Sequence, residues 1–138
     1  MLRPSNELAA VTWLQAIENL EAEAGTDLPK DFTEFVQATI VGGTPDMYLR
    51  ESRPVVQVDC WAATEGVSEP PWGRASHLAA VVLGATYENA QPLLELPAPY
   101  LSFHVQTAYP LSEPRRIPSD EARYARVQFD VQFHWRVP

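Results

Sequence analysis

Alternating apolar and polar residues mark the last part of the chain as a β-strand. Between residues 124 and 137 the odd-numbered positions are apolar and the even-numbered positions are polar. This two-residue period predicts a strand with one buried face. Shorter stretches of the same period predict strands over residues 32–41, 55–62 and 100–109, with a short return arm over 47–49. The chain is therefore expected to form a sheet with one apolar side.

Two segments show the three- and four-residue spacing of apolar positions that predicts amphipathic helices. The first begins at Ser5, a good N-cap residue, and runs to Ala24, after which Gly25 is a natural stop. The second covers residues 72–90 and has small alanines on its apolar side. A glycine pair followed by proline predicts a turn over residues 42–46.

Together these elements predict one α+β domain over residues 1–138, of the broad α/β kind, in the order α-β-β-β-α-β-β. The one-sided alternation favours a mixed, mainly antiparallel β-sheet with two helices packed on one face. The proline-rich residues 110–122 are too long for an ordinary hairpin loop. We expect this segment to project as an arm, and the turn of residues 42–48 to project as well.

Composition narrows the classes of function. A chain of 138 residues, 46% apolar and 20% charged, fits a single globular domain. Its net charge of −8 argues against binding to nucleic-acid phosphates and against docking on an anionic membrane. The chain has no apolar run of membrane-spanning length and no signal-peptide pattern at its start, so we expect a soluble protein made in the cytoplasm.

Motifs for catalysis are missing from the sequence. There is no glycine-rich phosphate loop, no GxSxG and no HExxH, so we expect neither enzyme activity nor a cofactor. The single cysteine, Cys60, falls on the apolar side of a strand and is expected to be a buried, inert thiol. His104, His134 and Asp130 are the candidates if the chain is instead a small ligand- or zinc-binding α/β domain.

Aromatic residues and arginines lie at strand ends or on the polar side of the predicted strands. Both residue types are enriched in protein interfaces, so we interpret them as contacts with a neighbouring subunit or partner. Arg115 and Arg116, at the tip of the expected arm, would pair with acids of a neighbour. The candidate interface residues are Met47, Tyr48, Trp61, Tyr109, Arg115, Arg116, Tyr124 and Arg126.

Three segments stand out when taken together: VVQVDCWA at 55–62, WGRASHLAAVV at 72–82 and YARVQFDVQFHWR at 124–136. They follow an N-terminal amphipathic helix and the turn GGTPD at 42–46. In this arrangement the chain resembles the tail terminator, or tail completion, proteins of long-tailed, non-contractile bacteriophages. None of the segments is a catalytic signature, and neither residues 92–99 nor the arm of residues 110–122 carries a motif of that family.

The resemblance implies a structural virion protein, made in the host cytoplasm, that forms a homohexameric ring at the head-proximal end of the tail. Such a ring would cap the tube, end polymerisation of the major tail tube protein and offer its other face to the head–tail connector or stopper. Genomic DNA would pass through the lumen without specific binding, and the acidic charge would help it slide. The alternative is a connector or stopper of the same neck, which would share the ring but not the tube-capping face.

Overall fold

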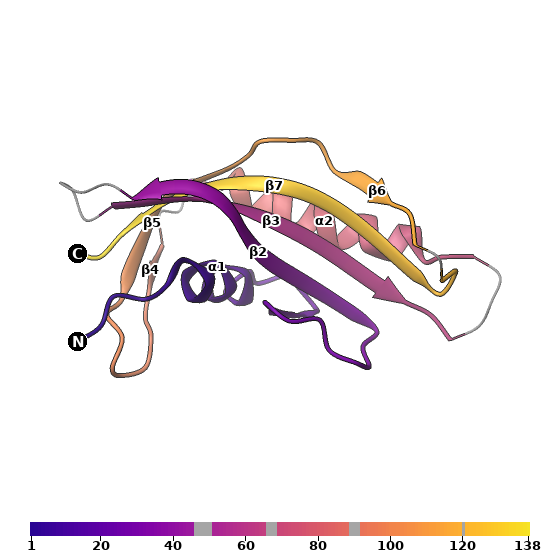
Figure 1. The fold of residues 1–138 in the computed structure, drawn as a ribbon, viewed down its shortest axis with the longest axis horizontal. Coiled ribbons are helices and arrows are strands. Elements are labelled where there is room, and N and C mark those ends of the chain that lie inside the picture. Colours follow the sequence, from indigo (N-terminus) through magenta and orange to yellow (C-terminus); the bar gives the residue numbers. More distant parts are fainter. Residues whose placement is uncertain (46–50, 66–68, 89–91, 120) are drawn as a thin grey trace.

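The computed structural model describes residues 1–45, 51–65, 69–88, 92–119 and 121–138 (Figure 1). Two helices and a set of β-strands make up this part of the chain. Their bounds, in chain order, are α1 Asn6–Gln15, β1 Glu23–Gly25, β2 Glu34–Pro45, β3 Glu51–Ala63, α2 Trp72–Thr86, β4 Leu93–Leu94, β5 Phe103–Pro110, β6 Arg115–Ile117 and β7 Tyr124–Arg136.

The strands form one curved sheet in the order β1-β2-β3-β7-β5-β4, and β6 pairs with β7 on the same side as β5. Among the described strands, β1 and β2 pair in parallel and every other pair is antiparallel. The mixed, mainly antiparallel sheet predicted from the sequence is therefore confirmed. The long strand β7 lies at its centre, with β3 on one side and β5 and β6 on the other.

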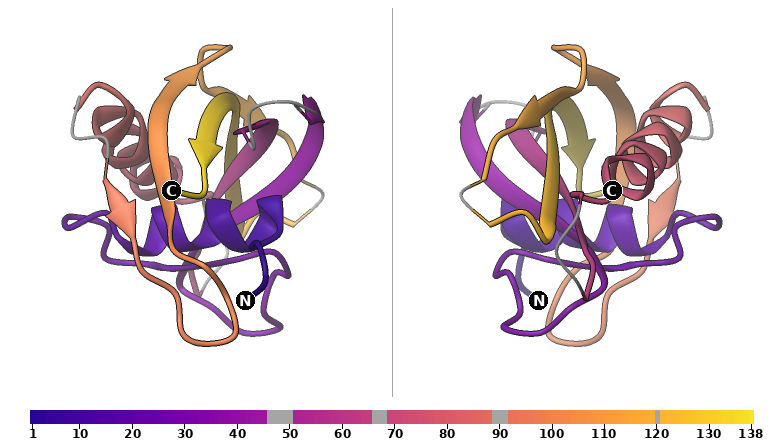
Figure 2. Two further views of the ribbon diagram at one scale, coloured as in Figure 1. Left: turned by 90° about the vertical axis from the view of Figure 1, so that its left-hand side faces the viewer. Right: turned by 90° about the vertical axis from the view of Figure 1, so that its right-hand side faces the viewer.

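Both helices pack on the same face of the sheet, as predicted (Figure 2). The odd-numbered residues of β7 from Ala125 to Trp135 are buried there, in the same cluster as Leu14 of α1 and Val82 of α2. Trp13 of α1 meets Phe133 edge-on, with 4.9 Å between ring centroids. The period-two pattern of β7 thus indicates which side of the sheet the helices cover.

The first helix is shorter than its apolar pattern predicts. Its start is as expected, because the Leu8 amide donates a hydrogen bond of 3.1 Å to the Ser5 hydroxyl. It ends at Gln15 rather than Ala24, and β1 then pairs in parallel with Phe35–Gln37 of β2. The side-chain amide of Gln15 donates to the Ala24 carbonyl at 3.3 Å. Pairing with the sheet outweighs the helical pattern in this stretch.

The turn predicted over residues 42–46 is wrong for residues 42–45. These residues continue β2 and pair with Val55 to Ser52 of β3, after a register shift between Ile40 and Gly42. Gly43 has a φ of 109°, and a Cβ there would collide with the Arg53 carbonyl, so the position requires glycine. Asp46 and the return arm predicted over 47–49 lie outside the described residues.

Residues 110–122 were expected to project as an arm, and this expectation is wrong for the part that pairs with β7. Arg115–Ile117 form β6, opposite Gln128 to Arg126 of β7. Just before β6, the Leu111 amide donates to the Asp130 carbonyl at 2.8 Å. Beyond the end of β5, backbone groups of β7 would otherwise lack partners, and pairing with this segment supplies them.

Candidate functional site

The face of the sheet opposite the helices has a network of polar side chains built around Asp59 of β3. Asp59 is 1% exposed, and its Oδ1 lies 2.9 Å from both Arg126 Nε and Gln128 Nε2 of β7. Gln57 Nε2 donates to the other carboxylate oxygen at 3.2 Å. The guanidinium of Arg115 in β6 donates to the side-chain oxygen of Gln128. The network ties three neighbouring strands together and fixes both arginines in place.

Next to this network lies a group of half-buried rings from separate parts of the chain. Phe32 stacks on Tyr124 with ring centroids 5.7 Å apart, and Trp61 meets both rings edge-on at 6.3 Å. The guanidinium of Arg126 lies 5.0 Å from the Trp61 ring centroid, and that of Arg123 lies 4.6 Å from the Tyr124 centroid. We call these five residues (Phe32, Trp61, Arg123, Tyr124 and Arg126) the aromatic–arginine cluster.

Strand register explains why the cluster forms at this end of the sheet. Trp61 stands directly opposite Arg126, and Tyr124 stands opposite Ala63. The Trp61 indole N–H donates to the Gln37 side-chain oxygen at 3.1 Å, which fixes the ring on the polar face. Each charged or polar group of the cluster therefore has a hydrogen-bond partner within the chain. The arrangement is an ordered, partly apolar surface.

The structure brings together some of the predicted interface residues and separates others. Trp61, Tyr124 and Arg126 lie in the aromatic–arginine cluster, and Arg115 is joined to it through Gln128 and Asp59. Arg116 lies elsewhere, with its guanidinium 4.9 Å from the ring centroid of Trp72 at the start of α2. Tyr109 lies 6.2 Å from the His134 ring. Met47 and Tyr48 lie outside the described residues.

Sequence reasoning did not select Phe32, Asp59, Gln128 or Arg123. Period-two alternation places Asp59 on the side of Trp61, and Gln128 on the side of Arg126. That signal was present, but the register that sets Asp59 beside Arg126 depends on how β3 and β7 pair. Phe32 was predicted to begin the strand of residues 32–41, but it precedes β2 and reaches the cluster from a loop, so the strand pattern did not place it there.

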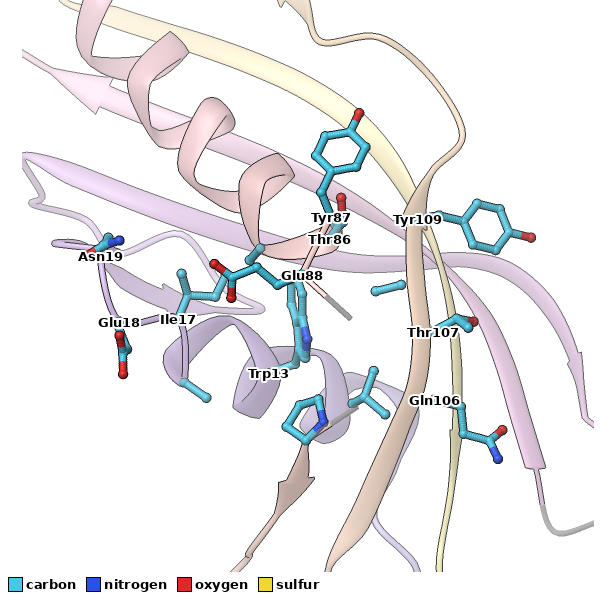
Figure 3. Close-up of a pocket in the computed structure, with 15 residues that line it drawn as sticks. Trp13, Ile17, Glu18, Asn19, Thr86, Tyr87, Glu88, Gln106, Thr107 and Tyr109 are labelled. Atoms are coloured by element: carbon cyan, nitrogen blue, oxygen red, sulfur yellow. The ribbon is translucent and has the colours of Figure 1, made fainter. Parts of the chain in front are cut away.

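A cleft of about 560 Å³ opens on the other side of the molecule, between the ends of α1 and α2 and strand β5 (Figure 3). Trp13 and Ile17 line its apolar part, and its charged lining residues among those described are Glu18 and Glu88. Tyr109 lies at its border, with the ring directed away from α2 (Figure 3). The cleft is thus separate from the aromatic–arginine cluster, and His104, His134 and Asp130 do not line it.

The three residues named for ligand or zinc binding do not converge. His104 stands opposite Arg136 of β7 rather than opposite His134. The His134 Nδ1 lies 3.8 Å from a Glu51 carboxylate oxygen, and Asp130 Oδ1 is buried with no hydrogen-bond partner among the described atoms. Within the described ranges, no three His, Cys, Asp or Glu side chains lie close enough together to hold a metal ion.

Cys60 is fully buried in the core, as predicted. Burial raises the pKa of its thiol far above the ordinary range, and the nearby charge of Asp59 raises it further. The thiol is therefore protonated and shielded from reagents at neutral pH.

The chain matches no protein-family model, and a search of curated proteins finds no match either. No helix in the described part of the chain is long and apolar enough to cross a membrane.

Proposed function

We propose that this chain is a ring-forming subunit of a phage tail, of the tail terminator kind. The ring would cap the tail tube, end its polymerisation and present a second face to the head connector. The observation that supports this most is the aromatic–arginine cluster on the face of the sheet that the helices leave uncovered. Rings and arginines of this kind supply most of the binding energy in many protein interfaces.

The side chains of this cluster are already fixed within one subunit, and this also favours an assembly role. Arg126 is held by Asp59 at 2.9 Å, and Trp61 is held by Gln37 at 3.1 Å. Side chains already fixed before binding lose little conformational freedom when a partner docks. Each contact in a ring must form between subunits that arrive one at a time, so a fixed surface suits this role.

Light scattering of the purified protein, alone and with polymerising tube protein of the same phage, tests the proposal. We expect either a six-subunit mass alone or a species that joins tube ends and halts their growth. A monomer that leaves tube growth unchanged would contradict the tail terminator role. A ring that forms but leaves the tube unchanged would instead support the connector or stopper alternative.

A further inference from the structure

The outer edge of β2 is open over most of its length. Parallel pairing with β1 covers only Phe35 to Gln37, and among the described residues no strand pairs with β2 on that side from Ala38 to Pro45. In a paired strand, alternate residues direct their N–H and C=O groups outward. Eight residues of strand span about 25 Å, which is long enough to template another strand.

This edge lacks the charged side chains that usually prevent edge-to-edge pairing. Residues 38–45 read ATIVGGTP, with no acid or base, and Val41 is 50% exposed. A register shift between Ile40 and Gly42 twists the edge without covering it. Figure 2 shows β2 near the border of the sheet, where only the short strand β1 lies outside it. An uncharged edge of this length is a template for pairing with another strand.

The opposite border of the sheet has a second, shorter open edge, formed by the three-residue strand β6 and the segment that leads into it. Residues 111–117 follow β7, and among the described residues no strand pairs with β6 on its far side. This segment carries the exposed guanidinium-bearing residues Arg115 and Arg116. The two edges belong to opposite borders of one sheet, so a copy adding to one edge leaves its own equivalent edge free for the next copy.

The two borders differ in charge. Residues 18–34, which include β1, contain six acids and one lysine, and five of these acids are exposed. Residues 115–126, which include β6, contain four arginines and two acids. An acidic border repels its own copy and attracts a basic one. Pairing of unlike borders is therefore favoured over a twofold pairing of β2 with β2.

We propose that the β2 edge of one subunit, residues 38–45, pairs with the β6 edge, residues 111–117, of a second copy of this chain. The sheet then continues from subunit to subunit. Such a head-to-tail contact closes into a ring when its rotation permits. This inference rests on the proposed function, because it names the contact through which that ring would form.

Cysteine crosslinking distinguishes the two pairings. Thr39 on β2 and Glu113 before β6 are exposed, while the native Cys60 is buried and does not compete. We expect neither Thr39→Cys nor Glu113→Cys alone to crosslink with a bismaleimide, the mixture of the two to yield dimers, and the double variant to yield a ladder. Dimers from Thr39→Cys alone would overturn the head-to-tail pairing.

Light scattering and crosslinking of the same samples, with and without tube protein, show whether the edge pairing or the proposed function has failed. Assembly by light scattering with no crosslink in the mixture would overturn the edge pairing and leave the ring standing. A monomer in both conditions, with no crosslink, would overturn both.

Exchanging charges between the acidic and the basic border tests the electrostatic part of the proposal. We expect Glu23→Lys and Arg116→Glu each to weaken self-association about fivefold at low salt, and the double variant to recover most of the loss. Glu95→Lys is the matched control, since Glu95 is exposed and belongs neither to the acidic border of residues 18–34 nor to the basic border of residues 115–126. If the double variant is no better than the single ones, the two borders do not meet.

Discussion

The two faces of the sheet are built from the same strands by different means. The helix-covered face is a continuous apolar cluster, and none of its buried side chains among the described residues is charged. The uncovered face buries a carboxylate, Asp59, and satisfies it with side chains of Arg126, Gln128 and Gln57. The first face holds the domain together, whereas the second fixes the aromatic–arginine cluster in place.

The largest effect is expected from a charge placed on the helix-covered face. Val131 is fully buried in β7, so Val131→Asp buries a carboxylate without partners and should cost more than about 4 kcal/mol, enough to unfold the domain. Leu93→Asp is the control at a position that is 50% exposed and lies outside both proposed edges, and it should cost less than about 0.5 kcal/mol. Urea unfolding followed by circular dichroism measures both. Similar losses of unfolding free energy in the two variants would show that burial does not determine the cost of an added carboxylate at these positions.

A smaller loss is expected from the Asp59 network. Asp59→Asn removes the charge that Arg126 faces and sets an amide against two other amides, so the free energy of unfolding should fall by about 2–3 kcal/mol. Glu121→Gln makes the same chemical change in the exposed pair with Arg123 and should cost less than about 0.5 kcal/mol. An equal, small loss in both would mean that the buried network does not stabilise the uncovered face.

Assembly should depend on the uncovered face more than stability does. Tyr124→Ala removes a ring from the aromatic–arginine cluster and should lower stability by about 1–2 kcal/mol while abolishing tube capping. Tyr87→Ala removes a ring that is 72% exposed and lies at the end of α2, and should leave capping unchanged. Capping assays on both folded variants check this. Normal capping by Tyr124→Ala would remove the cluster from the interface.

The smallest effect is expected from the thiol of Cys60, which lies on the helix-covered face of β3. The pKa of Cys60 is raised in the folded state, so folding favours the protonated thiol and this contribution is lost as pH rises above the ordinary thiol value of 9.0. Above pH 9 the free energy of unfolding of the native protein should fall by about 1.4 kcal/mol per pH unit relative to Cys60→Ala. Parallel pH profiles for the two proteins would contradict this assignment.

The apolar face was predictable because its signal is local. Alternation over residues 124–137 predicted this strand, and the structure has it at Tyr124–Arg136. The uncovered face was only partly predictable, because its contacts depend on register between distant strands. Trp61 and Arg126 were both selected from the sequence, yet their pairing follows from the alignment of β3 with β7.

The errors share a physical cause as well. The sequence predicted helix for residues 23–25 and a projecting arm for residues 115–117, because the composition of these segments does not favour β-strand. Each segment nevertheless forms a strand by pairing with a longer one. Short edge strands take their structure from the neighbour whose backbone groups they satisfy. The glycines at 42 and 43 read as a turn for a similar reason, since the bulge that accommodates them depends on β3.

Images of tubes grown with and without this protein test the central claim most directly. Tube protein is polymerised alone, with a molar excess of the native chain, and with the Tyr124→Ala variant, and tube lengths are measured by negative-stain electron microscopy. The account predicts short tubes with added density at one end for the native chain only. Tubes of equal length and bare ends in all three samples would contradict it.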